Sequence, residues 1–427
     1  MELITGYLVL FIFLILIGIP IAFSLGISTL LIFMISGAPA GLIPQRMWNG
    51  ISSFPLVAIP LFILAGELMS TGGILARILD FARLLVGRFK GGLYHVNILI
   101  SMIFGGLNGS AVADTSAVGA LLIKPTVDEY KDPDLAAAVT ACSSVVGPII
   151  PPSVPMLVYA FVGEVSVTEM FSAGMVPGIL IGLGLMVVTY LITLRKNYVV
   201  QVKPTPFKEV LRIFRRFLLP FLLPLIMIGG IVSGIFTPTE AGCVATLYAL
   251  VVGFFVTREL TLKKCYNAFL RTAMLTAIVM IMVSVAGVAT NWLARMQVTL
   301  LVAGLFKSIT ATPGGFWPLY ILFLLIIGLF LEQVAAIIMI VPVMLPVALS
   351  YGITPVQFGL VTVVTLAAGL VTPPVGLCVY ISSGIARRKV EGVFLHALPY
   401  LALMVGIIFL LAMFPGIYLW VPKMLGF

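Results

Sequence analysis

Long apolar runs with almost no charged residue between them constrain this chain more than any other feature. Of its 427 residues, 61% are hydrophobic and 9% are charged, whereas a soluble domain has about 25% charged residues. Backbone polar groups in lipid must find partners within the chain, so apolar runs of about 20 residues are expected to be helices that cross a membrane. The sequence therefore predicts an all-α polytopic membrane protein.

Single spans are expected near 3–18, 20–36, 54–71, 134–160, 173–194, 217–234, 239–256, 272–292, 356–382 and 395–420. The first apolar run is too long for a signal peptide, and we interpret it as retained spans. Two other apolar stretches, 94–124 and 316–350, are interrupted at their middle by small or polar residues. Each is too long for one span and too short for two. We expect re-entrant helical hairpins whose tips end inside the membrane.

Basic residues are distributed unevenly around these spans. With the N-terminus outside and each hairpin returning to its own side, 20 of the 24 Lys and Arg residues fall in cytoplasmic segments. Such a positive-inside bias indicates orientation in a bacterial inner membrane. The net charge of +9 therefore reflects topology, and we expect no nucleic-acid partner.

Two basic segments are predicted to be amphipathic arms on the cytoplasmic surface. One covers 77–90 and precedes the first hairpin, and the other covers 195–216. Basic amphipathic segments bind anionic lipid headgroups, so membrane lipids are expected partners. The second arm contains Arg195, Lys196, Lys203, Lys208, Arg212, Arg215 and Arg216.

The sequence also repeats itself at an offset of 222 residues. The matched positions are Gly106 and Gly328, Pro133 and Pro355, Gly147 and Gly369, and the pairs Pro151-Pro152 and Pro373-Pro374. The two halves begin on opposite sides in the predicted topology, so the repeat is inverted. Inverted repeats with broken helices are typical of secondary transporters, whose sites lie where the helices break. An ancient duplication without surviving functional symmetry is the alternative.

The tip of the first hairpin, GGLNGSAVADTSAVG, is rich in groups that bind ions. Unwound carbonyls can hold sodium, and the N-terminus of a half-helix presents N–H donors to an anion. Close packing through small residues is the alternative. Packing explains Gly106 and Gly109. It does not explain Asn108, Ser110 and Asp114.

Paired prolines interrupt the span that follows each hairpin. Proline lacks a backbone donor and leaves the carbonyl four residues earlier without its usual partner. Free carbonyls are therefore expected at 147–150 in GPIIPPSVP and at 369–372 in GLVTPPVG. A simple kink is the alternative. We expect one cation between 106–110 and 147–152, and a second between Gly328 and 369–375.

Ionisable residues at membrane depth are costly, so they are candidates for function. The guanidinium of Arg295 suits a carboxylate substrate, although an interfacial arginine that reaches the headgroups is equally compatible. Glu332 lies in the second tip, LFLEQVAA. Asp114 either caps the hairpin or touches a ligand. Glu67 is expected to pair inside the bundle.

Other kinds of chemistry lack a sequence signal. No ATP-binding G-x-x-x-x-G-K-[ST] loop is present. The four cysteines are scattered and the two histidines stand apart, which argues against a disulfide framework and a metal cluster. We see no catalytic constellation, so the chain is not expected to be an enzyme.

The strings GSAVADTSAVG, GPIIPPSVPMLVYA, LFLEQVAAIIMIVPVMLPVA and GLVTPPVGL resemble the large membrane subunit of TRAP transporters, the tripartite ATP-independent periplasmic carriers. The resemblance covers nearly the whole chain. It implies the ion transporter superfamily fold, with a scaffold and an elevator-type transport domain. It also implies sodium coupling, a separate small four-helix membrane subunit, and a periplasmic binding protein. The cargo would be an organic acid anion such as a C4-dicarboxylate, sialic acid or another sugar acid.

Residues are carried over from this family by motif. Two sodium sites would be formed by Asn108, Gly147, Ile150 and Pro152, and by Gly328, Gly369, Thr372 and Val375. Substrate contacts would include Ser110, Asp114, Arg295 and Glu332, and many relatives carry aspartate at the position of Glu332.

The predicted hairpins divide the chain into five parts. Residues 1–93 form scaffold helices and the first arm, 94–172 the first half of the transport domain, 173–315 scaffold helices and the second arm, 316–390 the second half of the transport domain, and 391–427 a C-terminal helix.

Two other functions are compatible with such a fold. A self-sufficient sodium-coupled dicarboxylate or citrate symporter often has a Ser-Asn-Thr string at both tips, whereas here the tips contain Asn-Gly-Ser and Leu-Glu-Gln. A channel can also contain deep hairpins and broken helices.

Overall fold

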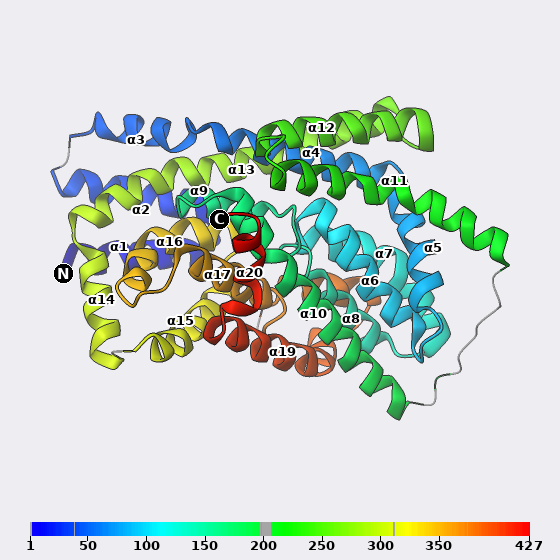
Figure 1. Cartoon of the computed structure of the whole chain (residues 1–427). Coiled ribbons are helices and arrows are strands. Elements are labelled where there is room, and N and C mark those ends of the chain that lie inside the picture. The colour runs from blue at the N-terminus through cyan, green and yellow to red at the C-terminus, as the bar shows by residue number, and fades with distance from the viewer. Residues whose placement is uncertain (1, 38, 197, 199–205, 311, 374) are drawn as a thin grey trace.

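The computed structural model describes residues 2–37, 39–196, 198, 206–310, 312–373 and 375–427. Lys203 of the second arm and Pro374 of the second proline pair lie outside these residues. The regular elements of the described part are all helical, which confirms the predicted all-α class. The N-terminus lies at one end of the elongated molecule (Figure 1).

Figure 1 shows one layer of helices along the upper edge of the molecule, and the other helices lie below it. The helices of the upper layer are α3 (Leu42–Ile51), α4 (Ala58–Thr71), α11 (Phe207–Val232), α12 (Pro238–Val251) and α13 (Leu262–Arg295). Elements near the N-terminal end include α1 (Glu2–Leu16), α2 (Ile21–Ile35) and α14 (Val298–Ile309). The remaining long helices are α10 (Val167–Arg195) and α19 (Val390–Met413). The short helix η1 (Phe54–Val57) lies between α3 and α4, and α20 (Gly416–Met424) is the last helix of the chain.

Five helices among the described residues are long and apolar enough to cross a membrane. They are α10, α11, α12 with its π-helical extension η2 (Val252–Thr257), α13 and α19. Each overlaps one of the predicted spans at 173–194, 217–234, 239–256, 272–292 and 395–420, although α19 ends at Met413 and the end of the last span lies in α20. The prediction of a polytopic membrane protein is confirmed.

Both predicted hairpins are pairs of helices with a break between them. α6 (Gly92–Asn108) and α7 (Ala111–Tyr130) are separated by Gly109 and Ser110. Gly109 has φ +61°, a left-handed conformation that glycine adopts without steric cost. Residues 329–332 separate α15 (Pro313–Gly328) from α16 (Gln333–Leu349). The breaks are therefore confirmed, whereas the position of the tips inside a membrane stays a prediction.

The paired prolines also break the helices that contain them. The predicted span 134–160 consists of α8 (Pro133–Ser144) and α9 (Val154–Val162), and 356–382 consists of α17 (Pro355–Gly369) and α18 (Leu377–Ala386). The described residues between the two helices of each pair are not helical. Unwinding, and not a simple kink, is what the proline pairs produce here.

The repeat found in the sequence extends to the helix boundaries. α7 begins at Ala111 and α16 begins 222 residues later at Gln333. α8 and α17 begin at Pro133 and Pro355, with the same offset. The N-cap residues correspond as well, since Ser110 caps α7 and Glu332 caps α16.

Glycines allow the helix that enters each hairpin to touch the backbone of the following broken helix. A Cβ atom built on Gly105 would lie 2.4 Å from the Cα of Gly147, and one built on Gly328 would lie 3.1 Å from the Cα of Gly369. A side chain at Gly105 would force the backbone apart, and one at Gly328 would make an unusually tight contact. Glycines thus allow each hairpin to pack against the unwound segment of its own half.

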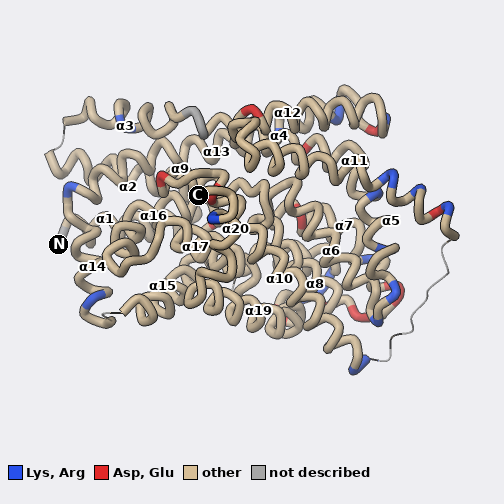
Figure 2. The backbone as a smooth tube through the Cα atoms, viewed as in Figure 1, with Lys and Arg blue, Asp and Glu red and all other residues tan. Residues whose placement is uncertain are grey.

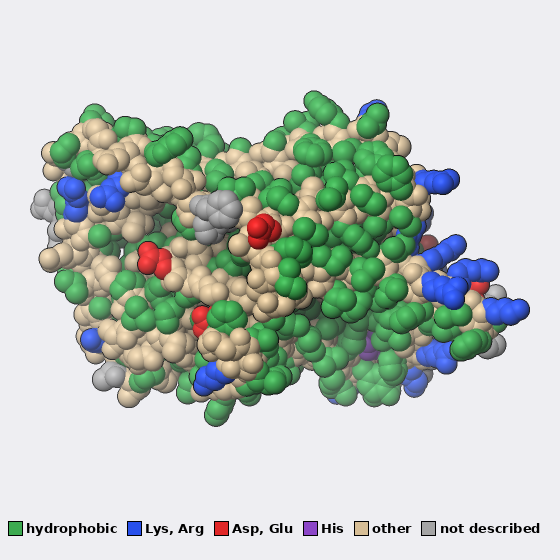
Figure 3. Space-filling view, turned by 45° about the horizontal axis from the view of Figure 1, so that its top comes forward, with side chains coloured by type: hydrophobic (Ala, Val, Ile, Leu, Met, Phe, Trp, Pro, Cys, Tyr) green, Lys and Arg blue, Asp and Glu red, His purple; other side chains and the backbone are tan. Residues whose placement is uncertain are grey.

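Basic residues gather at the end of the molecule opposite the N-terminus (Figures 2 and 3). This end contains α5 (Ile74–Val86), the start of α11 and the end of α10. α5 forms the first predicted arm, bends from α4 by 72°, and stacks Phe81 on Phe217 of α11. The second arm differs from the prediction, because its residues from Phe207 onward are the first turns of the 26-residue helix α11.

We predict that Gly105→Ala destabilises the protein, because the new methyl group would press on the backbone of Gly147. Overpacking of this kind costs about 1–3 kcal/mol. Thermal unfolding of the detergent-solubilised protein should show a lower midpoint than the wild type. The control is Gly406→Ala in α19, where nothing lies within 4 Å of the new atom. Equal midpoints for the two variants would contradict the proposed contact.

Candidate transport site

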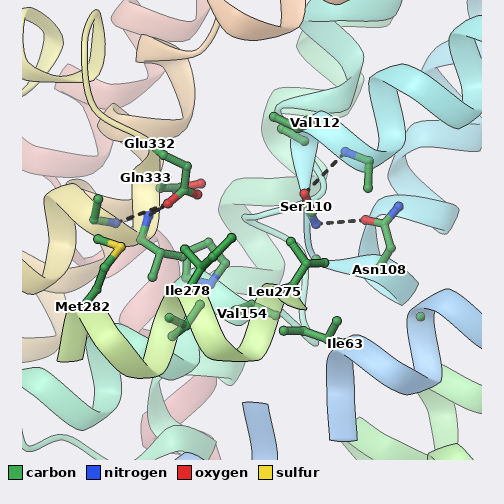
Figure 4. Close-up of a pocket in the computed structure, with 18 of the residues that line it drawn as sticks. Ile63, Asn108, Ser110, Val112, Val154, Leu275, Ile278, Met282, Glu332 and Gln333 are labelled. Carbon is green, nitrogen blue, oxygen red and sulfur yellow. Dashed lines mark hydrogen bonds between the residues drawn. The ribbon is translucent and has the colours of Figure 1, made fainter. Parts of the chain in front are cut away.

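A cavity of about 480 Å³ lies where the two hairpin tips meet the helices of the upper layer. The first tip contributes residues 108–113, and the second contributes residues 332–335. The opposite wall comes from α2, α4 and α13, including Ile63, Leu275 and Met282 (Figure 4). Small-molecule sites of transporters lie at such meeting points of broken helices.

At the first tip, the cavity is bordered by the N-terminus of α7. The Ser110 hydroxyl accepts a hydrogen bond from the Ala113 backbone N–H at 3.4 Å, and the Asn108 side-chain oxygen accepts one from the Ser110 N–H at 2.9 Å. Both residues are labelled in Figure 4, and both line the cavity. Val154 and Pro155, at the start of α9, line it as well. The positive ends of two helix dipoles therefore border the space.

At the second tip, the N-terminus of α16 borders the same cavity. The Glu332 carboxylate accepts hydrogen bonds from the backbone N–H groups of Val334 at 2.9 Å and Ala335 at 3.2 Å (Figure 4). An acidic N-cap satisfies donors that a helix start otherwise leaves free. The side chain of Glu332 remains exposed to the cavity.

The first unwound segment lies directly against the first tip. A Cβ atom built on Gly109 would lie 3.2 Å from the Pro152 carbonyl oxygen, and one built on Gly106 would lie 3.3 Å from that of Pro151. Within the described residues, the carbonyls of Gly147, Ile150 and Pro152 accept no hydrogen bond. Unsatisfied carbonyls in an apolar surrounding are costly, and they suit a hard cation such as sodium. The donor set of the first predicted site therefore fits the ion.

The second unwound segment has a similar arrangement. Gly328 and Gly369 are in contact, and the carbonyls of Gly328 and Thr372 accept no hydrogen bond from the described residues. The carbonyl of Gly369 accepts one from the Thr372 N–H at 3.1 Å, and the Thr372 hydroxyl donates to the Ala368 carbonyl at 2.9 Å. Val375 follows in the same segment and is partly exposed. These residues also fit a cation site.

A model of the DctM component of tripartite ATP-independent periplasmic transporters matches residues 8–417. The chain belongs to this family. The resemblance to TRAP transporter large subunits is thereby confirmed, and such permeases are transporters and not enzymes. DctM proteins are multi-pass membrane proteins, in agreement with the apolar helices described above.

Several characterised relatives are similar over most of their length. The sialic acid TRAP transporter large permease SiaM of Vibrio cholerae is 38% identical, over 95% of each chain. The C4-dicarboxylate large permease DctM of Pseudomonas aeruginosa is 35% identical, over 94% of each chain. The sialic acid permease SiaT of Haemophilus influenzae is 35% identical, and the match covers 98% of this chain and 68% of SiaT.

Solved structures of transporters share the fold at low sequence identity. The Alcanivorax borkumensis YdaH transporter has a TM-score of 0.65 at 15% identity, over 87% of this chain and 88% of YdaH. The Neisseria gonorrhoeae MtrF efflux pump has a TM-score of 0.62 at 14% identity, over 90% of this chain and 84% of MtrF. These similarities concern the fold of the DctM chain alone.

Of the predicted substrate residues, Ser110 and Glu332 line the cavity, and Arg295 and Asp114 do not. Arg295 is exposed at the C-terminal end of α13. It follows Met282 of the cavity wall by 13 residues, or about 20 Å along the helix axis. Asp114 is buried behind the tip.

Glu67 lies 3.8 Å from Arg271, whose side chain is 65% exposed, so the pair lies at the surface of the bundle and not inside it; Glu67 also lines the cavity. No sequence pattern marks the apolar wall formed by α4 and α13. Ile63, Leu275 and Ile278 resemble any other lipid-facing residue of a span until the neighbouring helices are in place.

We predict that Glu332→Ala destabilises the protein, because it leaves two backbone N–H groups of α16 without their acceptor. Loss of an N-cap costs about 0.5–2 kcal/mol. Glu332→Gln keeps one acceptor oxygen, so its thermal midpoint should lie between those of the wild type and the alanine variant. Glu391→Ala, an exposed acidic residue in the first turn of α19, is the control. An unchanged midpoint in Glu332→Ala would refute the capping role.

Proposed function

We propose that this DctM chain is the large membrane subunit of a sodium-coupled secondary transporter that imports a small organic acid anion. The observation that carries the proposal is the convergence of the N-termini of α7 and α9, which have no acidic N-cap, on one cavity. Helix N-termini offer backbone N–H donors and a positive dipole end to a carboxylate. The relatives include permeases named for sialic acid and for C4-dicarboxylates, which supports the same class of cargo.

Sodium coupling is the second part of the proposal. Asn108, Gly147, Ile150 and Pro152 would hold one ion, and a second would be held by Gly328, Gly369, Thr372 and Val375. The cavity supports a need for cations, since the Glu332 carboxylate lines it without a basic residue among the described lining residues, whereas Glu67 is paired with Arg271. Positive charge from ions bound beside the tips would offset this negative field.

We further propose an elevator mechanism in which the transport domain slides along the scaffold. Gly66 of α4 supports such motion, because it lets the scaffold backbone pass close to the first tip: a Cβ atom there would lie 2.9 Å from the Cα of Asn108. A slide along α13 would also bring the tips toward Arg295. Arg295 could then contact the anion in a different conformation.

The partners proposed for the chain are a small four-helix membrane subunit and a periplasmic binding protein that delivers the substrate. The bacterial inner membrane is the proposed location, supported by the gathering of basic residues at one end of the molecule (Figure 2). Anionic lipids would bind at this end.

Reconstitution tests the proposed function. Liposomes that contain this chain, the small subunit and the binding protein should accumulate radiolabelled sialic acid or a C4-dicarboxylate when an inward sodium gradient is imposed. Omission of any one component should abolish uptake. Uptake by this chain alone would favour a self-sufficient symporter, and sodium-independent flux that does not saturate would favour a channel.

We predict that Thr372→Ala raises the sodium concentration needed for half-maximal uptake by on the order of tenfold, which corresponds to about 1.4 kcal/mol. The hydroxyl orients the second unwound segment through its bond to Ala368. The matched control is Thr257→Ala, whose hydroxyl also donates to a carbonyl four residues earlier but lies in η2. Unaltered sodium activation in Thr372→Ala would count against this site.

A further inference from the structure

Asp114 is a buried carboxyl group that lacks a hydrogen-bond partner. It lies in the first turn of α7 and has no exposed surface. Neither of its carboxylate oxygens makes a hydrogen bond with any residue that the structure describes. An uncompensated buried charge is among the most costly features a protein can contain.

The side chains near Asp114 come from three neighbouring helices. Ser101 of α6 and Ser144 of α8 lie against the carboxyl group, and both are fully buried. The thiol of Cys378 is close by from α18, and a thiol is only a weak donor. No Lys or Arg side chain in the described part of the chain forms an ion pair with Asp114.

The hydroxyls of these serines also reach other groups. The Ser144 hydroxyl donates to the Thr140 carbonyl at 2.8 Å. Ser143 donates to the Asn97 side-chain oxygen or to the Thr140 carbonyl, each at 3.1 Å. The Ser101 and Ser143 hydroxyls lie 3.0 Å apart, and either oxygen can be the donor. A hydroxyl that donates to one of these groups keeps its oxygen lone pairs for a cation beside the carboxyl group.

A buried carboxylate without a basic partner is stabilised by a bound cation or by a proton. Two carboxylate oxygens and two hydroxyl oxygens form a donor set that a hard cation accepts. The single carboxylate balances one positive charge, so a monovalent ion leaves the cluster neutral. No group of three or more acidic, His or Cys residues suited to a divalent metal occurs among the described residues.

The polar cluster is confined to one half of the repeat. At the 222-residue offset, Asp114 corresponds to Ala336, Ser101 to Phe323, and Ser144 to Leu366. The helices at these positions are the same in both halves, so the fold does not need polar residues here. We therefore expect the cluster to have a function in the first half beyond support of the fold.

From this geometry we infer that Asp114, Ser101 and Ser144 form a third sodium site, one helical turn behind the tip residue Ser110. The Asp114 N–H donates to the Ser110 carbonyl at 3.0 Å, so an ion at Asp114 is coupled to the cap that borders the cavity. The inference deepens the proposed function, on which it rests for sodium as the coupling ion. It adds a site that is separate from the unwound segments.

The test is a count of bound sodium on the purified complex of this chain with its small subunit. Equilibrium binding of ²²Na⁺ at saturation should give one ion fewer per chain in Asp114→Asn than in the wild type. Asp128→Asn, an exposed aspartate of the same helix α7, should bind as many ions as the wild type. Ser144→Ala keeps the charge and should show weaker sodium binding, which provides a second variant if Asp114→Asn does not fold.

Thermal unfolding provides a readout that does not depend on transport. With sodium replaced by choline, Asp114→Asn should melt at or above the midpoint of the wild type, because the substitution removes an unpaired buried charge. Added sodium should raise the midpoint of the wild type more than that of the variant. An Asp114→Asn protein that binds the full number of ions overturns the inference. So does a wild-type midpoint that follows pH and not sodium, since Asp114 would then hold a proton.

This result is distinguishable from failure of the proposed function. If Asp114→Asn loses one ion at saturation and Thr372→Ala binds sodium with the affinity of the wild type, the third site stands and the site at the second unwound segment fails. If no organic anion is transported, the ion count at Asp114 still decides the inference.

Discussion

Backbone carbonyls that have lost their helical partners determine how this protein is built. In an apolar surrounding each such group must be satisfied within the chain, by a side chain or by an ion. The proline pairs unwind two helices and leave the carbonyls of Gly147, Ile150 and Pro152 without a hydrogen bond from the described residues. Glycines then bring a hairpin against each unwound segment. The hairpins, the breaks and the cavity all follow from this one constraint.

Because the architecture is repeated, the cavity has two similar sides. Because α7 and α16 start at equivalent positions of the repeat, their N-termini reach the same cavity from different halves of the chain. Neither half contains the cavity alone, since each tip supplies only one border. Long-range pairing of this kind gives the site a geometry that depends on the whole fold.

Much of this could be predicted from the sequence, because glycine and proline act through the local backbone. The breaks at Gly109 and at the proline pairs were expected from residue type alone, and the long spans from apolar length. Positions that depend on distant packing were not predictable. Arg295 was grouped with the substrate residues by motif, yet it lies at the far end of α13, and no pattern marked Leu275 or Met282 as a cavity wall. The second arm was misjudged because a basic, amphipathic stretch looks the same whether it lies on lipid or begins a long helix.

The different N-caps of α7 and α16 make the two sides of the cavity chemically unequal. Ser110 is neutral, whereas Glu332 carries a carboxylate at the equivalent position. A negatively charged molecule in this space is repelled at one border and accepted at the other. The charged end of the proposed organic anion would therefore point toward α7, so a cavity with two similar sides would hold it in a single orientation.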